Sequence, residues 1–143
     1  TTEDAFVVTS AFTGTISAPE DVANYKVGVQ SGTVQDGWLT DNLVTPGLLP
    51  ETNLSRYERV DQAALDLANG RIEVLMGDYV PVQALVAQNP DLQIVYRGVL
   101  STGPINIVLP DGDVELKAEV DRIIQELQAE GFIDDLAVKY FSE

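Results

Sequence analysis

The sequence predicts an α/β fold, with a mainly parallel sheet, flanking helices and a pair of C-terminal helices. Short apolar, β-prone segments alternate with amphipathic segments of roughly 8 to 12 residues. Turn residues separate the two kinds of segment, and the alternation stops near Pro110. Strands that alternate with helices in this way form βαβ units, in which the strands run parallel and the helices cover the sheet.

The predicted strands are short runs rich in Val, Ile, Leu and Tyr. The run AFVVT at residues 5–9 and the run YKVGV at residues 25–29 are strands by composition. Residues 56–60 alternate polar and apolar side chains, as a half-buried strand does. Further strands are predicted over residues 72–76, 92–96 and 105–109.

Helices are predicted where apolar residues recur three or four positions apart. Residues 34–44 carry Val34, Trp38 and Leu43 on one face, opposite a polar face. Asp61 is placed to cap the next helix, and a glycine or an Asn-Pro sequence ends several of the helices that follow. These further helices cover residues 62–69, 79–88, 114–130 and 132–141.

Composition and charge exclude several functions. The chain has 143 residues, with 8 Lys and Arg against 23 Asp and Glu, and its net charge of −15 disfavours binding to nucleic acid or to anionic membrane surfaces. Because it has no Cys and no His, disulfides, Ser-His-Asp catalysis and His-ligated zinc are excluded. No segment reaches the ~18 apolar residues of a membrane span, so we expect no membrane insertion. With no leader recognised, the chain is expected to be either cytoplasmic or the mature form of an exported protein.

Two loops that follow predicted strands carry candidate binding residues. Gln30-Ser31-Gly32-Thr33 leads into a helix, where the glycine permits close approach and the free N–H groups of the next turn can hold a carboxylate. Asp78 directly follows the apolar run 74–76. Each loop alone is compatible with a simple helix cap. Because parallel strands end at one edge of a sheet, the two loops together offer donors for a carboxylate and a carboxylate for an ammonium, which is what an α-amino acid needs.

Asp111-Gly112-Asp113 is the segment that suggests a metal. It resembles the opening of a calcium-binding loop, but the position that requires glycine holds Leu116. We therefore predict a turn and a helix N-cap at this segment, and we expect neither a metal site nor a cofactor in the chain.

Four motifs carry a resemblance to a known family. They are YKVGVQSGT at residues 25–33, NGRIEVLMGD at 69–78, INIVLPDGDVEL at 105–116 and EGFIDDLAVKYF at 130–141. In this order and at this spacing, the chain resembles the polar amino acid (family 3) solute-binding proteins, the extracellular or periplasmic receptors that supply ABC transporters.

The resemblance implies a type II periplasmic-binding-protein lobe with a flavodoxin-like sheet. Members of the family have two α/β lobes joined by two hinge strands, and the ligand is bound between the lobes. By resemblance, residues 1–103 form lobe 2 with the first hinge strand, and residues 104–143 form the second hinge strand and the helices that return to lobe 1. We expect the N-terminal lobe, which supplies an arginine for the ligand carboxylate, to be missing from this chain.

The resemblance also assigns ligand-binding roles. Asp78 takes the position that pairs with the α-ammonium of the ligand, and the loop at Gly32, Thr33 and the backbone N–H of Val34 takes the position that binds its α-carboxylate. Gln30 matches a position that contacts the ligand side chain. The family often has a hydroxyl residue or glycine where this chain has Val34, so here only the backbone of that residue can serve.

The expected function is that of a solute-binding lobe which binds a polar amino acid for an ABC permease, weakly or not at all as an isolated lobe. Two alternatives stay open. One is the ligand-sensing domain of a receptor, and the other is a dehydratase-type enzyme that uses Asp78 and Glu73; we expect no enzyme. The apolar stripe of Val120, Ile123, Ile124 and Leu127 needs a partner, either this sheet or a second copy in a homodimer.

Overall fold

The computed structural model describes residues 3–100 and 106–141, and it divides the chain into two units. Unit 1 comprises Thr1–Gly103 and unit 2 comprises Pro104–Glu143. Their assignment to a lobe, to hinge strands and to returning helices stays a prediction. Within the described residues, no helix is long and apolar enough to cross a membrane.

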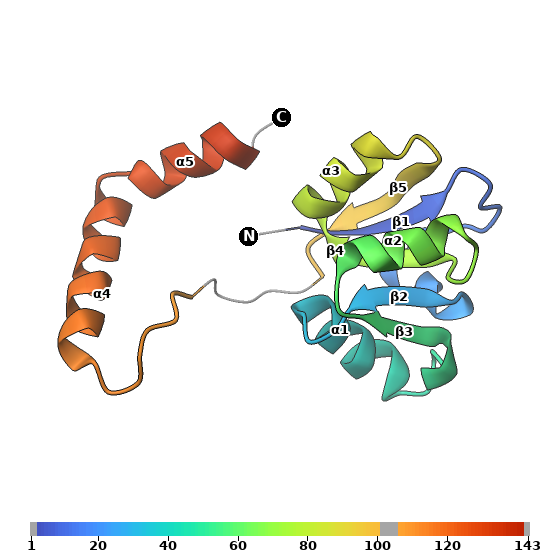
Figure 1. Cartoon of the computed structure of the whole chain (residues 1–143), viewed down its shortest axis with the longest axis horizontal. Helices are drawn as coiled ribbons and strands as arrows, with labels where there is room; N and C mark the ends of the chain where they lie inside the picture. Colours follow the sequence, from blue (N-terminus) through green and yellow to red (C-terminus); the bar gives the residue numbers. More distant parts are fainter. Residues whose placement is uncertain (1–2, 101–105, 142–143) are drawn as a thin grey trace. The chain divides into compact units, whose positions relative to one another are not determined.

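Unit 1 contains a five-stranded mixed sheet with the strand order β3-β2-β4-β1-β5 (Figure 1). Strands β2, β3 and β4 pair in parallel, and β1 runs antiparallel to both β4 and β5. Four strands therefore point in one direction, which confirms the prediction of a mainly parallel sheet with flanking helices. The strands are β1 (Asp4–Thr9), β2 (Val27–Gln30), β3 (Leu54–Tyr57), β4 (Val74–Asp78) and β5 (Leu92–Gly98).

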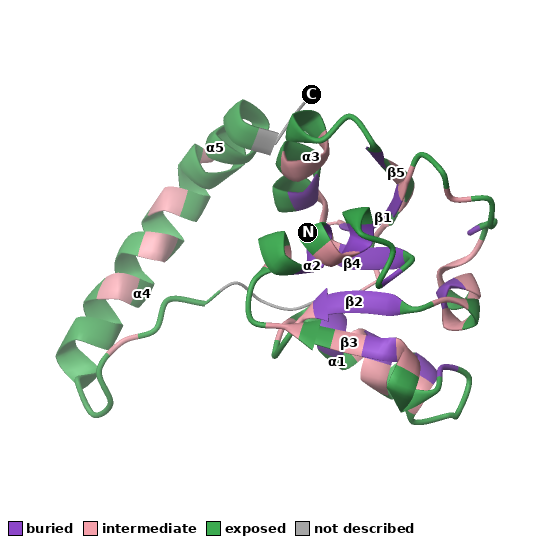
Figure 2. Cartoon of the chain, turned by 45° about the vertical axis from the view of Figure 1, so that its right-hand side comes forward, coloured by how far each residue is buried: buried purple, intermediate pink, exposed green. Residues whose placement is uncertain are grey.

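Both faces of this sheet are covered, because alternate residues of the strands point to opposite sides. Phe6 and Val8 of β1 belong to one buried cluster together with Leu39 and Leu43, whereas Val7 belongs to a second cluster on the other face. The second cluster is completed by α2 and α3, and Figure 2 shows the buried residues concentrated in the strands. The helices of unit 1 are α1 (Val34–Leu39), extended by a π-helix (Thr40–Val44), α2 (Val60–Ala68) and α3 (Tyr79–Gln88), with short 3-10 turns at Pro19–Asn24 and Glu51–Asn53.

Predictions about the positions of elements in unit 1 need correction, among them the cap at Asp61, since Arg59 is the N-cap residue of α2. The expected apolar face of α1 began at Val34, but the buried row is Gln35, Leu39 and Leu43, and Val34 is 55% exposed. These three buried residues are four positions apart and lie on one side of the helix, whereas Val34 is about 100° away around the axis. The expected strand at residues 56–60 instead ends at Tyr57, because α2 already begins at Val60.

Unit 2 consists of α4 (Val114–Ala129) and α5 (Phe132–Phe141). The prediction for Asp113 is confirmed, since it is the N-cap of α4 and its Oδ1 accepts a hydrogen bond from the N–H of Leu116 at 3.0 Å. The strand predicted over 105–109 is wrong for residues 106–109, and residue 105 lies outside the described residues. A strand needs a neighbour for its backbone groups, and residues 106–109 pair with none of the described strands.

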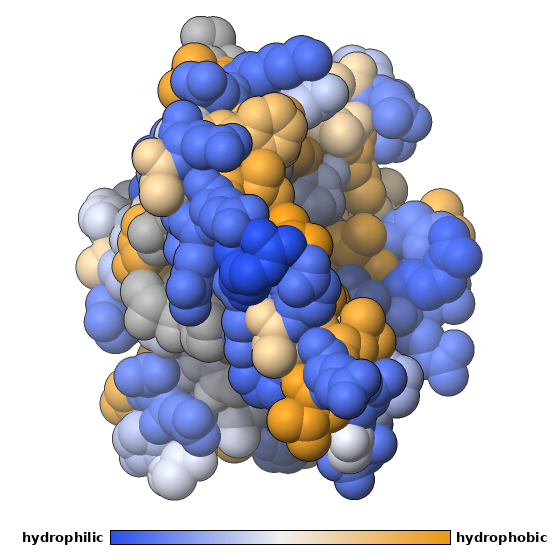
Figure 3. Space-filling model, turned by 90° about the vertical axis from the view of Figure 1, so that its left-hand side faces the viewer, coloured by the Kyte–Doolittle hydropathy of each residue, from blue (hydrophilic) through white to orange (hydrophobic). Residues whose placement is uncertain are grey.

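None of the described apolar side chains of unit 2 is buried, although Val120, Ile124 and Leu127 are half-buried. No residue of α4 is buried, and Val108 is 92% exposed. Figure 3 shows apolar residues interspersed among hydrophilic ones on the surface. Whether the stripe predicted on α4 is covered by the sheet or by a second copy stays open as a prediction.

Candidate functional site

Buried polar side chains gather at one edge of the sheet in unit 1. Among the residues that the structure describes, Asp4, Gln35 and Asp36 are buried, at 1%, 2% and 9% exposure. They lie where β2 and β4 end and β1 begins, because β1 runs antiparallel to β4. Buried polar groups are costly unless they are hydrogen-bonded, so this edge is the place to look for a site.

The loop after β2 is fixed by its own side chains. Thr33 is the N-cap of α1, and its Oγ1 accepts from the N–H of Asp36 at 3.3 Å while it donates to the carbonyl oxygen of Gln30 at 2.8 Å. Gly32 adopts a φ of 71°, a left-handed conformation that favours glycine. Its N–H donates to Oδ2 of Asp36 at 3.0 Å. The one proton of the Thr33 hydroxyl and the N–H of Gly32 are therefore used within the protein.

The backbone N–H groups of Thr33 and Val34 are candidate donors to a ligand at this loop. They lie at the first turn of α1, where N–H groups have no acceptor within the helix. Val34 is 55% exposed, so solvent reaches the start of α1 at this residue. Gln30 is held differently, because its Nε2 donates to the carbonyl oxygen of Glu58 at 3.1 Å.

Arg56 of β3 supports the loop from the side. Its Nε lies 2.7 Å from Oδ1 of Asp36, and its guanidinium also binds Glu51 and the hydroxyl of Thr40. The pKa of Arg56 is raised, first by the hydrogen bond that it donates to Glu51 and then by the one that it donates to Asp36. Because Asp36 also accepts from Gly32, the network ties β3 to the loop after β2.

Asp78 ends β4 and precedes α3, as the sequence predicted. It is the N-cap residue by position, but its side chain caps no backbone N–H of the helix. This corrects the alternative interpretation of the loop at Asp78 as a simple helix cap. Its Oδ1 instead accepts from Nε2 of Gln35 at 3.1 Å. The carboxylate is partly exposed, so solvent or a ligand can reach it.

Gln35 joins the two predicted loops, and the sequence analysis missed it together with Asp4. The Nε2 of Gln35 donates to Oδ1 of Asp4 at 2.7 Å as well as to Asp78. The partners lie 31 and 43 positions away in the chain, so no local pattern shows these contacts. The sequence did indicate such a contact, because Gln35 lies four positions before Leu39 and eight before Leu43, on the same buried face of the helix.

Tyr79 and Arg97 lie beside Asp78 at the same edge. The guanidinium carbon of Arg97 stands 3.7 Å from the centroid of the Tyr79 ring, and Arg97 forms an ion pair with Glu3. The backbone N–H of Tyr79 donates to the carbonyl oxygen of Glu3 at 2.8 Å. These contacts fix the start of α3, and with it the position of Asp78.

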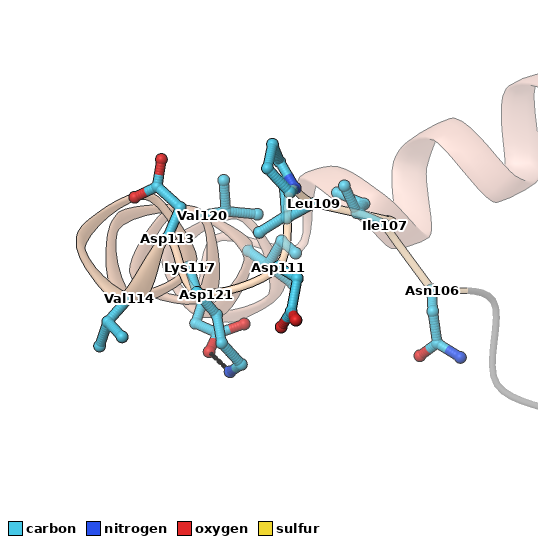
Figure 4. A pocket seen from close by; sticks show the side chains of 12 residues that line it. Asn106, Ile107, Leu109, Asp111, Asp113, Val114, Lys117, Val120 and Asp121 are labelled. Atoms are coloured by element: carbon cyan, nitrogen blue, oxygen red, sulfur yellow. Dashed lines mark hydrogen bonds and ion pairs between the residues drawn. The ribbon is translucent and has the colours of Figure 1, made fainter.

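A separate hollow lies within unit 2, between the segment before α4 and the helix itself. Leu109, Val120 and Ile124 line it together with Asp111, and Figure 4 shows Lys117 bound to Asp121 beside it. None of the predicted binding residues lines this hollow. Within the described residues, no group of three or more metal-binding side chains is present.

The edge of unit 1 therefore carries groups that suit two opposite charges. The carboxylate of Asp78 suits an ammonium group, and the N–H groups at the start of α1 suit a carboxylate. The structure brings together Asp78 and the loop at residues 30–34, which the sequence predicted to share one edge. Their roles towards a ligand stay a prediction.

No family model matches the chain. Comparison with known proteins nevertheless finds relatives of it. It is 26% identical over 135 residues to the ABC transporter arginine-binding protein 2 of Escherichia coli (strain K12), covering 91% of this chain and 53% of that protein. It is 28% identical over 128 residues to the L-cystine-binding protein TcyJ of the same strain, covering 90% of this chain and 46% of that protein. The chain thus spans about half the length of these curated relatives.

Solved structures show the same fold. An ancestral arginine-binding protein bound to glutamine matches 99% of this chain and 60% of its own, with 26% identity and a TM-score of 0.77. Domain 2 from TmArgBP matches 69% of this chain and 99% of its own, with 29% identity and a TM-score of 0.58.

The sheet and its flanking helices match the periplasmic-binding-protein fold of these structures, and the polar edge lies at the ends of parallel strands. The homologues of the chain are amino-acid-binding proteins of ABC transporters. The expected resemblance is thereby confirmed.

Proposed function

We propose that the chain is the lobe of a solute-binding protein that binds the charged groups of an α-amino acid for uptake by an ABC transporter. One observation carries this proposal: Gln35 bridges from the first turn of α1 to Asp78, so that a carboxylate and a set of N–H groups share one edge. Asp78 binds the α-ammonium of the ligand, and the N–H groups of Thr33 and Val34 bind its α-carboxylate. Gln30 and Gly32 shape the same loop.

The relatives guide the choice of ligand. Their names give arginine and cystine, and one structure holds glutamine. All three are α-amino acids, so the group shared by the ligands is the one that Asp78 and the loop can bind. Arginine is the first ligand to test because several of the matching proteins are named for it.

Unit 1 carries the proposed site by itself. Domain 2 from TmArgBP matches 69% of this chain, and unit 1 spans 103 of 143 residues, or about 72%. The agreement in size supports a correspondence between unit 1 and that domain. The second lobe of such a protein supplies the remaining ligand contacts, so we expect the affinity of this chain alone to be lower by ~10³-fold.

The partners and the location follow from the same proposal. An ABC permease is the transport partner, and the cell compartment is the periplasm or the extracellular side. A homodimer through α4 and α5 stays a prediction. The relatives named above are binding proteins and not enzymes, which supports the expectation of no catalysis.

The test is a titration of the chain with L-arginine, followed by NMR spectra of the backbone amides. We expect a dissociation constant of about 1 mM or weaker, with shifts at Thr33, Val34 and Tyr79. Asp78→Asn is expected to weaken binding by about tenfold, because a charged hydrogen-bonding partner of the ammonium is lost.

Asp91→Asn is the matched control, since Asp91 precedes β5 at the opposite edge of the sheet. Equal affinity of the Asp78→Asn variant and the wild type would contradict the proposed role of Asp78. A micromolar affinity of the wild-type chain would contradict the expectation that one lobe binds weakly.

A further inference from the structure

Gln35 belongs to both halves of the proposed site. It lies in the first turn of α1, directly after Thr33 and Val34, and its side chain is buried. Its single side-chain nitrogen donates to Asp78 at 3.1 Å and to Asp4 at 2.7 Å. One amide therefore connects the loop after β2 to the end of β4 and to the start of β1.

The chemistry of the amide fixes its orientation. The nitrogen carries two N–H donors, and an ionised carboxylate only accepts hydrogen bonds. Turning the amide over would place its oxygen against the oxygens of Asp4 and Asp78, which repel it. The orientation with the nitrogen between the two carboxylates is thus the one that satisfies all three groups, and it holds Gln35 at a fixed distance from Asp78.

Asp4 holds the Gln35 amide from the buried side of the site. It is 1% exposed, and its Oδ2 accepts from the N–H of Leu100 at 3.0 Å. Asp4 and Asp78 are also direct partners in the pairing of β1 with β4. Because Asp4 is shielded from solvent whereas Asp78 is partly exposed, the two carboxylates have different tasks: Asp4 holds Gln35, and Asp78 faces the ligand.

We propose that Gln35 is a positioning residue that sets the separation between the Asp78 carboxylate and the N–H groups of Thr33 and Val34, with the buried Asp4 as its anchor. This rests on the proposed function. In an α-amino acid the ammonium and carboxylate are attached to the same carbon, whereas a β-amino acid places one more carbon between them. A fixed separation therefore selects α-amino acids over β-amino acids.

The test compares L-arginine with β-homoarginine, its counterpart with one additional backbone carbon, as ligands in NMR titrations. The wild-type chain is expected to prefer L-arginine by at least about tenfold. Gln35→Met keeps the length of the side chain but removes the donor, so affinity for L-arginine is expected to fall by about tenfold while affinity for β-homoarginine changes little. Gln62→Met is the matched control, because Gln62 is an exposed residue of α2.

A double variant separates positioning from a general structural role. If Gln35 acts through Asp78, then Gln35→Met changes the affinity for L-arginine by less than about twofold in a chain that already carries Asp78→Asn. Equal losses for both ligands, or fully additive losses in the double variant, would overturn the proposal.

A second readout does not depend on binding. In Gln35→Met the carboxyl carbon signal of Asp78 is expected to shift and its χ1 couplings to become averaged, whereas Gln62→Met leaves both unchanged. An Asp78 side chain that is equally ordered in Gln35→Met overturns the positioning role. If the wild type binds no amino acid while Gln35→Met disorders Asp78, then amino-acid binding by this chain alone fails and the positioning of Asp78 by Gln35 stands.

Discussion

Unit 1 buries apolar side chains in two clusters on the two faces of its sheet, whereas none of the described apolar side chains of unit 2 is buried. In unit 1 the strands place alternate residues on opposite faces, and helices cover both. In unit 2 the two helices contact each other, yet no residue of α4 is buried. Both units contain amphipathic helices, so a helical pattern alone does not say whether a core exists.

The difference teaches that the sheet makes the core. Each buried strand residue is contacted by neighbours from adjacent strands and from a covering helix, and a pair of helices offers only one such layer. The candidate site depends on the same sheet, since strands β1, β2 and β4 bring Asp4, Gln30 and Asp78 to one edge. We therefore expect substitutions to act very differently in the two units.

The largest expected difference between the units is in the free energy of unfolding when one leucine of each unit is replaced by alanine. Leu75 of β4 is fully buried, and Leu116 of α4 is 40% exposed. Leu75→Ala removes buried methyl groups and leaves a cavity, so the free energy of unfolding of unit 1 is expected to fall by about 2 to 5 kcal/mol. Leu116→Ala is expected to change it by no more than about 0.5 kcal/mol.

Urea unfolding followed by circular dichroism measures both variants against the wild type. Similar losses in the two variants would mean that α4 is covered by something in solution. In that case light scattering decides whether the cover is a second copy, which is the homodimer expected from the apolar stripe.

A smaller effect is expected from glycines in the left-handed conformation. Gly32 and Gly131 have φ angles of 71° and 75°, and a Cβ at either position would meet no atom within 4 Å. Alanine is strained in this conformation by about 1 kcal/mol. No steric clash adds to that cost, because the added Cβ meets no neighbouring atom. Gly32→Ala is thus expected to lower the stability of unit 1 by this amount, and Gly131→Ala, in unit 2, to leave it unchanged.

Gly37 supplies the matched control within α1. It has no positive φ, and its Cβ would likewise meet no atom within 4 Å. Gly37→Ala is expected to stabilise unit 1 by up to about 1 kcal/mol, because alanine favours the helix and restricts the unfolded chain. A loss of stability in Gly37→Ala would show that the backbone of α1 is strained in a way that its φ angles do not reveal.

Sequence patterns predicted the elements of unit 1 well, because each pattern there is local. The alternation of strands and helices, the helix at residues 79–88 and the position of Asp78 at the end of β4 all follow from short stretches. The strand at residues 105–109 was wrong for its described part because a strand also needs a neighbour, and composition does not tell whether one is available.

The candidate site was predictable only in part for a related reason. Asp78 and the loop at Gly32 were found because both follow apolar runs. Gln35 and Asp4 were not found, because their role depends on contacts between residues 31 or more positions apart. A polar residue on the buried face of a helix indicates such a contact. Gln35 is one, because it lies on the same face of α1 as the buried Leu39.

The smallest expected effect concerns ion pairs, and it again contrasts the two units. The pKa of Asp66 in α2 is lowered, first by Arg71 and then by the hydroxyl of Tyr57. A carboxyl with a lowered pKa in the folded state stabilises the protein above its ordinary value of 3.8, and this contribution is lost as the pH falls through the lower folded value. Asp66→Asn is therefore expected to lower the urea midpoint slightly at pH 7, and the difference from the wild type is expected to be smaller at about pH 3.

Glu119 in α4 is the counterpart in unit 2, since Arg122 lowers its pKa. Glu119→Gln removes an ion pair whose carboxylate side chain is 57% exposed, against 23% for Asp66, and it does so in a helix that adds no buried residue to the core. Its urea midpoint is expected to equal that of the wild type at both pH values, because an ion pair stabilises only the unit that contains it. A pH-dependent loss in Glu119→Gln as large as that in Asp66→Asn would mean that the two units unfold together.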